Sequence, residues 1–532
     1  MGLGRRVPPW FLDEDERRFP GRSLVREQPW TDGNLVEPLV HGHTYFARLA
    51  SELERLAPGD LVCVADWRGD DDEKLTDAGP TLAVLLTELA RRGVDVRGLL
   101  WRSHPKGLGF NEEEETELAA IVSAAGGTVL LDERVRRAGS HHQKLVVVHR
   151  PTDPDADMAF VGGIDLCHGR RDDLEHLGDE QAQHLDRRYG KRAPWHDAQA
   201  MVTGPAVAQL LETFRERWND PTPVERRSSP LRWVRMRTAR ERTVPDPIPS
   251  SGRAPTSTGT HAVQVLRTYP ARRPGYPFAP MGERTVERFY RKAFARATSL
   301  VYIEDQYFWS RDVGAALAGA LRREPELRVI VVVPRFPDRD GVLTGPAHRT
   351  GQHRTLTMVR EAGGDRVAVY DIENEQGTPI YVHAKVVVID DEVALLGSDN
   401  LNRRSWTHDS ELSIAVLDEE RDDRAPSDPG GRGDGARRFA RSLRLELERE
   451  HLGSTDDADP APIATFERWR ECARSLDAWH AGGRPGPRPT GRVRPHRLEP
   501  VAWWQQLYAV PLYRFLIDPD GSPRRPDPRE EA

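Results

Sequence analysis

Two short motifs contain the residue types and spacing that could do chemistry. They are His142-Gln143-Lys144 and His383-Ala384-Lys385. In an extended chain alternate side chains point the same way, so the imidazole and the ammonium of each motif share one face. An imidazole can attack phosphorus or transfer a proton, and an ammonium can stabilise charge on phosphate oxygens. One such motif is a weak signal, but two in matching positions favour a shared site.

An internal repeat places the motifs in matching positions. In each half a predicted helix precedes an apolar strand, and a second helix and a second strand follow before the His-x-Lys strand. Alternating strands and helices predict the α/β class, with a mixed or parallel sheet in each half. The helices, first strands and second strands are predicted at Tyr45–Leu56 and Arg284–Ala297, Leu61–Asp66 and Leu300–Asp305, and Val96–Trp101 and Arg328–Pro334.

Residues that follow each motif could complete an anion site. In the second half the chain continues to Asp390 and then to a Gly-Ser turn with Ser398 and Asn400, which can aim hydroxyl, amide and backbone donors at an anion. The first half has Gly163 and Asp165 at the corresponding place. Pseudo-two-fold symmetry would bring two His and two Lys around one pocket, which suits a phosphodiester. Because the lysines supply the positive charge, we expect no metal and no other cofactor.

With these motifs, the sequence resembles the phospholipase D superfamily, whose mark is a duplicated HxKxxxxD motif. It is most similar to the plant- and animal-type phospholipases D and their bacterial relatives. The resemblance implies the phospholipase D fold, two homologous α-β-α sandwich lobes packed with pseudo-two-fold symmetry around one active site. The segments that carry it are HHQKLVVVH (141–149), FVGGIDLCHGRRD (160–172), PWHDAQAMVTGP (194–205), VYIEDQYF (301–308), YVHAKVVVIDDEVALLGSDNLNRRS (381–405) and LRLELEREHLG (443–453).

The resemblance implies a role for each matching residue. His142 matches the nucleophile that forms a phosphohistidine intermediate. His383 matches the general acid that releases the head-group alcohol and then activates water. Lys144 and Lys385 match the phosphate-binding lysines, and Asn400 matches an asparagine that contacts the phosphate.

Each catalytic histidine of this family leans on a carboxylate, which fixes its tautomer. The matching residues here are Asp197 and Glu411, with Asp409 as an alternative to Glu411. Glu304 and Gln306 are expected to face the same cleft from the end of a strand.

The sequence departs from the family pattern at two positions. His149 stands where the first motif usually ends in Asp, and Asp165 stands where the second half has Asn400. We interpret both as variations that leave activity intact, because both His-x-Lys pairs are present.

The repeat and the resemblance together divide the chain. We expect an N-terminal extension at 1–30, a first lobe at 31–220, a linker at 221–260, a second lobe at 261–455 and a C-terminal tail at 456–532. About 30 residues are too few for the calcium- or phosphoinositide-binding modules of plant and animal relatives, so dependence on either is not expected. The stretch Asp422–Gly435 is predicted to be a disordered loop.

Composition narrows the classes of function. The chain has 532 residues, a net charge of −7, 38% hydrophobic residues and three cysteines. The net charge encodes no general electrostatic grip on nucleic acid but leaves room for a local basic channel, and three scattered cysteines are too few for a disulfide framework. No run of 18 apolar residues is present, so we expect a cytoplasmic monomer that meets a lipid substrate peripherally, at the inner membrane surface. The aromatic segment Trp503–Leu516 could dip into a membrane interface, but docking onto the protein body is favoured.

The leading hypothesis is a phospholipase D that hydrolyses glycerophospholipids to phosphatidate and a free alcohol, with transphosphatidylation as a related reaction. The alternatives are a phosphatidyltransferase of the cardiolipin-synthase type, a nuclease with the same site, and a non-catalytic lipid-binding scaffold. The acidic net charge weighs against the nuclease, and two intact motifs weigh against the scaffold.

Overall fold

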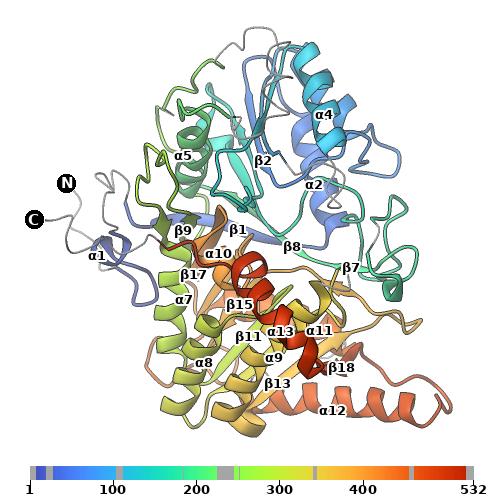
Figure 1. Ribbon diagram of the computed structural model, residues 1–532. Helices are drawn as coiled ribbons and strands as arrows, with labels where there is room; N and C mark the ends of the chain where they lie inside the picture. Colours follow the sequence, from blue (N-terminus) through green and yellow to red (C-terminus); the bar gives the residue numbers. More distant parts are fainter. Residues whose placement is uncertain are drawn as a thin grey trace, which may run out of the picture.

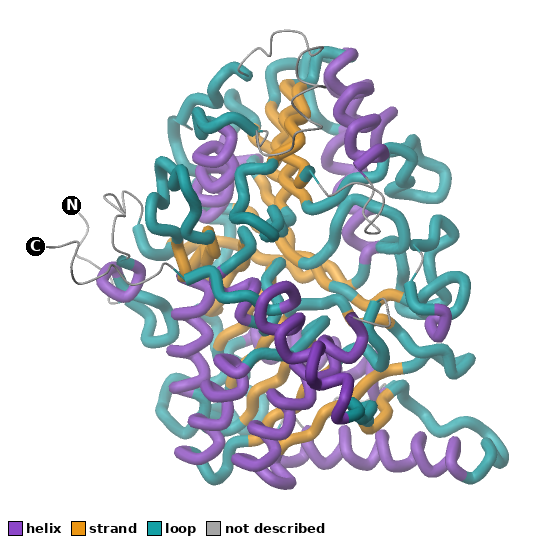
Figure 2. The backbone as a smooth tube through the Cα atoms, viewed as in Figure 1, coloured by secondary structure: helices purple, strands orange, loops and turns teal. Residues whose placement is uncertain are grey.

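The structure is a computed structural model that describes residues 7–18, 28–102, 112–183, 185–224, 245–250, 252–338, 344–453 and 461–522. Its central feature is one long β-sheet shared by both halves of the chain, with helices on both faces (Figure 1). Figure 2 shows the strands continuing from the upper half into the lower half. The mixed α/β class predicted from the sequence is confirmed. Most of the expected linker at 221–260 lies outside the described residues.

The first half contributes seven strands in the spatial order β1-β8-β6-β5-β2-β3-β4. Helices α2, α3 and α4 cover one face of these strands, and α5 covers the other. The elements are β1 (Thr31–Val40), α2 (Gly42–Glu54), β2 (Leu61–Asp66), α3 (Leu82–Arg91), β3 (Asp95–Trp101), α4 (Glu112–Ala124), β4 (Thr128–Asp132), β5 (Leu145–His149), β6 (Met158–Gly162), β8 (Ala198–Thr203) and α5 (Ala206–Trp218).

The second half repeats this order as β9-β17-β16-β15-β11-β12-β13, with β18 added at the far edge. Helices α7, α8 and α9 pack on one face, and α11 and α12 pack on the other. The elements are β9 (His261–Tyr269), α7 (Thr285–Arg296), β11 (Leu300–Glu304), α8 (Arg311–Arg323), β12 (Arg328–Val332), α9 (Thr344–Gly363), β13 (Val367–Ile372), β15 (Val386–Ile389), β16 (Val393–Gly397), α10 (Arg403–Thr407), β17 (Glu411–Asp418), α11 (Arg438–Leu452), α12 (Pro462–Ala481), β18 (Val493–Pro495) and α13 (Trp503–Leu512).

The halves are joined at the edge strands β1 and β9, which pair antiparallel. The register shifts between Thr31 and Asn34, and side chains replace the interrupted ladder. The Asn34 amide donates to the main-chain oxygen of His261, and the main-chain nitrogen of Val36 donates to the His261 ring. One apolar core cluster includes residues of both halves, such as Val147 and Val388. The two lobes therefore share a core as well as a sheet.

The His-x-Lys motifs lie just before their strands and not within them. β5 begins at Leu145 and β15 begins at Val386. At the motifs the main chain leaves its own sheet and pairs with the opposite half, which explains why the ladders begin later than expected.

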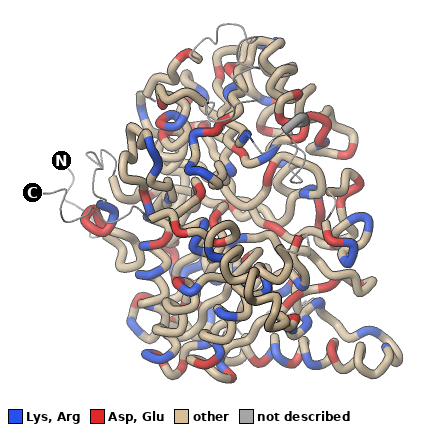
Figure 3. The backbone as a smooth tube through the Cα atoms, in the orientation of Figure 1, with Lys and Arg blue, Asp and Glu red and all other residues tan. Residues whose placement is uncertain are grey.

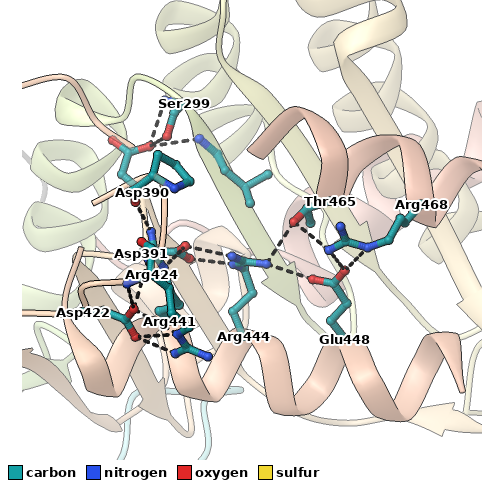
Figure 4. A network of polar contacts seen from close by, with 12 residues as sticks. Ser299, Asp390, Asp391, Asp422, Arg424, Arg441, Arg444, Glu448, Thr465 and Arg468 are labelled. Carbon is teal, nitrogen blue, oxygen red and sulfur yellow. Dashed lines mark hydrogen bonds and ion pairs between the residues drawn. The ribbon is translucent and has the colours of Figure 1, made fainter. Parts of the chain in front are cut away.

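The last position of the motif has a structural role that differs between the halves. Asp390, at the end of β15, accepts hydrogen bonds from the main-chain nitrogens of Thr298, Ser299 and Leu300 at 2.8–2.9 Å. It thereby fixes the start of the neighbouring strand β11 (Figure 4). In the first half the equivalent His149 bonds instead to Asp157, through Nδ1 at 2.6 Å. The histidine that replaces the usual aspartate therefore has its own partner nearby, at the end of β5 that lies away from the His-x-Lys motif.

The predicted disorder of Asp422–Gly435 is wrong, because buried ion pairs order this loop. Asp422 is bonded by Arg424 and by the fully buried Arg441, which also bonds Asp391 (Figure 4). The polar composition of the loop suggested disorder, but its charges pair with a helix that is distant in sequence.

Replacing Asp390 with alanine should destabilise the fold strongly. Three main-chain donors and Arg432 lose their acceptor, so we expect a loss of about 3 kcal/mol or more in the free energy of unfolding, measured by urea denaturation. His149→Ala is the matched control and should cost clearly less, because it removes one bond at a partly exposed site. Equal losses in the two variants would contradict this account.

Candidate active site

Two equivalent crossings of the main chain bring the motifs together. Strand β14 (Tyr381–Val382), just before His383, pairs parallel with β7 (Trp195–His196) of the first half. In the symmetry-related crossing, His141 bridges to Ser410. The main-chain nitrogen of His142 donates to the oxygen of Ser410 at 2.9 Å, and that of His383 donates to the oxygen of His196 at 2.8 Å. Each motif is thus held by the opposite half.

Each histidine is oriented by a carboxylate from the other half. His142 Nδ1 lies 2.9 Å from Glu411 Oε2, and His383 Nδ1 lies 2.6 Å from Asp197 Oδ2. A proton on Nδ1 that bonds the carboxylate leaves Nε2 free to act on a substrate. The alternative partner Asp409 does not hold His142, because its carboxylate bonds Arg404 and the main-chain nitrogen of Ser140.

The two lysines have different surroundings. Lys144 Nζ lies 3.0 Å from Asp165 Oδ1 and donates to the main-chain oxygen of His142 at 3.1 Å. Lys385 Nζ donates to the main-chain oxygen of His383, and no ion pair with a carboxylate is found for it among the described residues. In the second half Asn400 stands at the position equivalent to Asp165. The buried Asn400 Oδ1 has no hydrogen-bond partner among the described residues. The net positive charge of the site is therefore centred on Lys385.

The turns after β6 and β16 differ for a steric reason. Ser398 Oγ donates to Glu411 Oε2 at 2.5 Å and accepts from the main-chain nitrogen of Leu412 at 3.1 Å. A Cβ atom at Gly163 would lie 2.3 Å from Asp197 Oδ1, so only glycine leaves room for that carboxylate. Trp195 takes the place of the serine as a donor, because its Nε1 bonds Asp197 Oδ2 at 3.2 Å.

A buried aspartate bonds the main chain of each turn, the one after β6 and the one after β16. Asp66 accepts from the main-chain nitrogen of Leu166 at 2.9 Å, and Asp305 accepts from that of Leu401 at 2.8 Å. These bonds are equivalent in the two halves. They set the positions of Asp165 and Asn400, which precede the bonded nitrogens.

The electrostatics of the site follow from burial and from the two lysines. Burial, and then the charge of Lys385, lower the pKa of His383 to about 3. Burial and the charge of Lys144 hold the pKa of His142 well below its usual value. Burial lowers the pKa of Lys385 itself to about 8, and burial together with the nearby Asp409 raises the pKa of Glu411 to about 8. Without an anion, the site therefore holds neutral imidazoles beside ammonium groups.

Glu304 and Gln306 have different surroundings, although the sequence predicted that both face one cleft. Glu304 is fully buried, and its carboxylate bonds His196 Nε2 and His451 Nε2, each at 2.7 Å. The expectation that Glu304 faces the cleft is therefore corrected. Alternation along β11 points it toward these histidines, while Gln306, beyond the strand end, bonds the Tyr381 hydroxyl at 2.8 Å.

The histidines around Glu304 form a polar cluster that sequence reasoning missed. His41, His176, His196 and Glu450 converge, and His196 also joins Glu304 and His451. Within each group the possible ligand atoms lie within 4.8 Å of one another, so these residues could hold a metal ion. His196 also accepts the main-chain bond of His383, so the cluster supports the catalytic crossing. The sequence feature that could have indicated this cluster is the segment 443–453, because its residues Glu450 and His451 were given no role.

An open pocket lies beside the site, on the side of the second half. Its lining includes Gln306, Tyr307, Trp309, Phe336 and Tyr381. The ring of Tyr381 is centred 6.4 Å from the His383 ring, so the pocket adjoins the second histidine. The remaining lining is largely polar and includes Arg335, Arg349 and Glu499, so the pocket combines aromatic walls with charged groups.

Comparison with known proteins identifies the class to which this site belongs. The family described as "Phospholipase D" matches residues 60–313, and the family described as "Cardiolipin synthase, PLD-like domain" matches residues 290–424. The chain therefore belongs to the phospholipase D superfamily, as the duplicated motif indicates.

Curated relatives include plant phospholipases D. Phospholipase D beta 1 of Arabidopsis thaliana is 27% identical over 442 residues, which cover 63% of this chain and 39% of that protein. Phospholipase D alpha 1 of Cynara cardunculus is 27% identical over 499 residues, which cover 72% of this chain and 59% of that protein. The chain thus spans between about two fifths and three fifths of the length of these two relatives.

A solved structure shows the same fold. The phosphatidylserine synthase of Haemophilus influenzae Rd KW20 matches with a TM-score of 0.51 and 14% identity, over 84% of this chain and 95% of that one. Among the described residues, none of the helices has the length and apolar character needed to cross a membrane.

The pKa of Lys385 predicts an alkaline limit to activity. The ammonium is charged below its pKa of about 8 and neutral above it, so kcat/KM for a phosphodiester should fall as the pH rises through about 8. A bound phosphate stabilises the charged form, so the limit should shift upward in the pH profile of kcat. Glu411→Gln removes the other group with a pKa of about 8 and should leave this limit in place. Its disappearance in that variant would assign the limit to Glu411 instead.

Proposed function

We propose that this protein is a phospholipase D-type phosphodiesterase that cleaves glycerophospholipids to phosphatidate and a free alcohol. The observation that carries the proposal is the exchange of carboxylates between the halves, which engages Nδ1 of His142 and of His383 and leaves both Nε2 atoms available in the neighbourhood of the lysines. The names of the curated relatives support a phospholipid as the substrate.

The first step forms a covalent intermediate. Nε2 of neutral His142 attacks phosphorus, the bond from phosphorus to the head-group oxygen breaks, and His383 donates its Nε2 proton to that oxygen. Lys144 and Lys385 stabilise charge on the non-bridging oxygens. Burial and then repulsion by Lys385 lower the pKa of His383, and the negative charge of a bound phosphodiester raises it again, which favours the protonated form that the first step needs.

The second step reverses the proton transfer. His383, now neutral, removes a proton from water, and the water oxygen attacks phosphorus. The bond to His142 breaks, and phosphatidate leaves. A primary alcohol in place of water gives transphosphatidylation, and a lipid alcohol gives the phosphatidyltransferase reaction. The match to a family described as cardiolipin synthase favours keeping that acceptor as the second candidate.

Replacing each histidine separately should reveal its role. His142→Ala and His383→Ala should each lower kcat for choline release from phosphatidylcholine by about 10³-fold or more. With an activated p-nitrophenyl leaving group, which needs no proton, His383→Ala should recover most of its first-step burst, while His142→Ala should not. His168→Ala, near the site but bonded to Asp72, is the control and should keep wild-type rates.

Near-wild-type rates in either catalytic variant would refute the paired-histidine mechanism. Recovery of His142→Ala and not of His383→Ala with the activated substrate would reverse the two roles.

The class of substrate and acceptor should be visible in the products. Wild-type protein on mixed phospholipid vesicles should release phosphatidate in water, and a phosphatidyl ester when a primary alcohol is added, as measured by mass spectrometry. Cleavage of single- or double-stranded DNA with no lipid product would favour the nuclease. Cardiolipin formed from phosphatidylglycerol in preference to phosphatidate would favour the transferase.

A further inference from the structure

The C-terminal segment presents an apolar face to solvent. It comprises α13 and the π-helical turn Tyr513–Ile517 that follows it. Its large apolar side chains are unusually exposed, with exposed fractions of 76% for Trp503, 53% for Trp504, 72% for Leu507, 80% for Phe515 and 48% for Leu516. We call these five side chains the aromatic face. A group of apolar side chains this exposed marks an interaction surface.

The opposite side of the segment is docked firmly onto the protein. Ala509 and Tyr513 are buried in a cluster with Trp309 and with Ala347 of α9. The Tyr513 hydroxyl donates to Asp518 at 2.8 Å. The expected docking onto the protein body is therefore present, but it uses only one side of the segment and leaves the aromatic face exposed.

A relay of hydrogen bonds ties the segment to the catalytic loop. Arg404 donates to the main-chain oxygen of Leu516 at 2.8 Å and to Asp409 at 2.7 Å. Asp409 in turn accepts from the main-chain nitrogen of Ser140 at 2.9 Å. Ser140 and Asp409 each lie two residues from a member of the His142–Glu411 pair. The aromatic face is thus held at a fixed position relative to the first histidine.

The segment also borders the pocket beside His383. Trp309 lines that pocket and packs against the inner side of the segment. The segment therefore packs against one wall of this pocket.

Between the exposed Glu499 and Asp520, the segment itself carries only positive charge. Residues 500–517 contain no aspartate or glutamate, and α13 is tan in the foreground of Figure 3. Arg514 on the segment and Arg354 on the adjacent α9 are exposed. Tryptophan at an apolar surface with nearby arginines is typical of segments that lie in the interface of a bilayer that contains anionic lipid.

We propose that the aromatic face docks this enzyme on a phospholipid bilayer and holds the site next to its substrate; this inference rests on the proposed function. A bilayer suits the face better than a second copy of the chain. Five side chains are few for a stable protein interface, which buries about 1,600 Å². Tryptophan and arginine together match a lipid interface in chemistry. The product, phosphatidate, is anionic and would strengthen the contact with Arg354 and Arg514.

A fluorescent reporter tests insertion directly. Leu507→Cys in a Cys472→Ser background carries an environment-sensitive dye, because the remaining Cys63 and Cys167 are buried. Vesicles of phosphatidylcholine and phosphatidylglycerol should increase the emission and shift it to shorter wavelength. The same dye on Ile463→Cys, an equally suitable exposed site on α12 (53% exposed), should not respond. Equal responses at both sites, or none at Leu507→Cys, would overturn the proposal.

Kinetics separate docking from catalysis. The triple variant Trp503→Gln, Leu507→Gln, Phe515→Gln should bind these vesicles at least about tenfold more weakly in co-sedimentation. It should lose activity on vesicles but keep wild-type kcat/KM on a short-chain monomeric phosphatidylcholine. The control Val84→Gln, Ile463→Gln, with both side chains exposed elsewhere, should keep both activities.

The failures are distinguishable. Wild-type protein that binds vesicles through this face but cleaves no phospholipid would refute the proposed function and leave docking standing. Wild-type protein that cleaves the short-chain lipid and binds vesicles as well as the triple variant does would refute docking alone. A wild-type dimer that the triple variant abolishes, in analytical ultracentrifugation, would also overturn docking by assigning the face to a second copy.

Discussion

The candidate active site depends on an exchange between the two halves, in which the histidine of each His-x-Lys motif takes its carboxylate from the opposite lobe. His142 is oriented by Glu411, and His383 by Asp197. The exchange extends to the backbone, because each motif also bonds the main chain that leads to its partner carboxylate. Neither lobe alone can hold its histidine in a defined tautomer. The shared sheet through β1 and β9 and the common apolar core provide the rigidity that this arrangement needs.

The two halves of the site are not identical, and the differences fit the two different roles that the proposed mechanism gives to His142 and His383. Attack and proton donation require different groups, and the surroundings of the two histidines differ accordingly. Lys144 is balanced by Asp165, whereas Asn400 stands at the equivalent position in the half that contains Lys385. The carboxylates differ as well, since the pKa of Asp197 is lowered, in part by His383 and Lys385, and that of Glu411 is raised. An ionised Asp197 favours a protonated His383, which fits a general acid.

The sequence predicted the repeated strands well, and it singled out the two His-x-Lys motifs that the structure brings together, because both have local signatures. Buried strands such as Leu61–Asp66 are continuous apolar runs, and the His-x-Lys pairs recur in order. The direction of the Glu304 side chain and the histidine cluster were not predicted, because they depend on which helix, distant in sequence, packs against β11. The ordered conformation of Asp422–Gly435 was not predicted for the same reason, because its charged residues pair with α11. The consequence of His149 in place of the usual aspartate also depends on the three-dimensional structure, because Asp390 and His149 bond different partners.

The central claim is that the two lobes build one site in which His142 is the nucleophile. The most direct measurement is tandem mass spectrometry of protein that has been acid-quenched during turnover of a short-chain phosphatidylcholine, after digestion under conditions that preserve phosphoramidates. The account predicts a phosphatidyl adduct on the peptide that contains His142 and none on the peptide that contains His383. An adduct on His383, or turnover that accumulates no adduct even in His383→Ala supplied with an activated substrate, would contradict it.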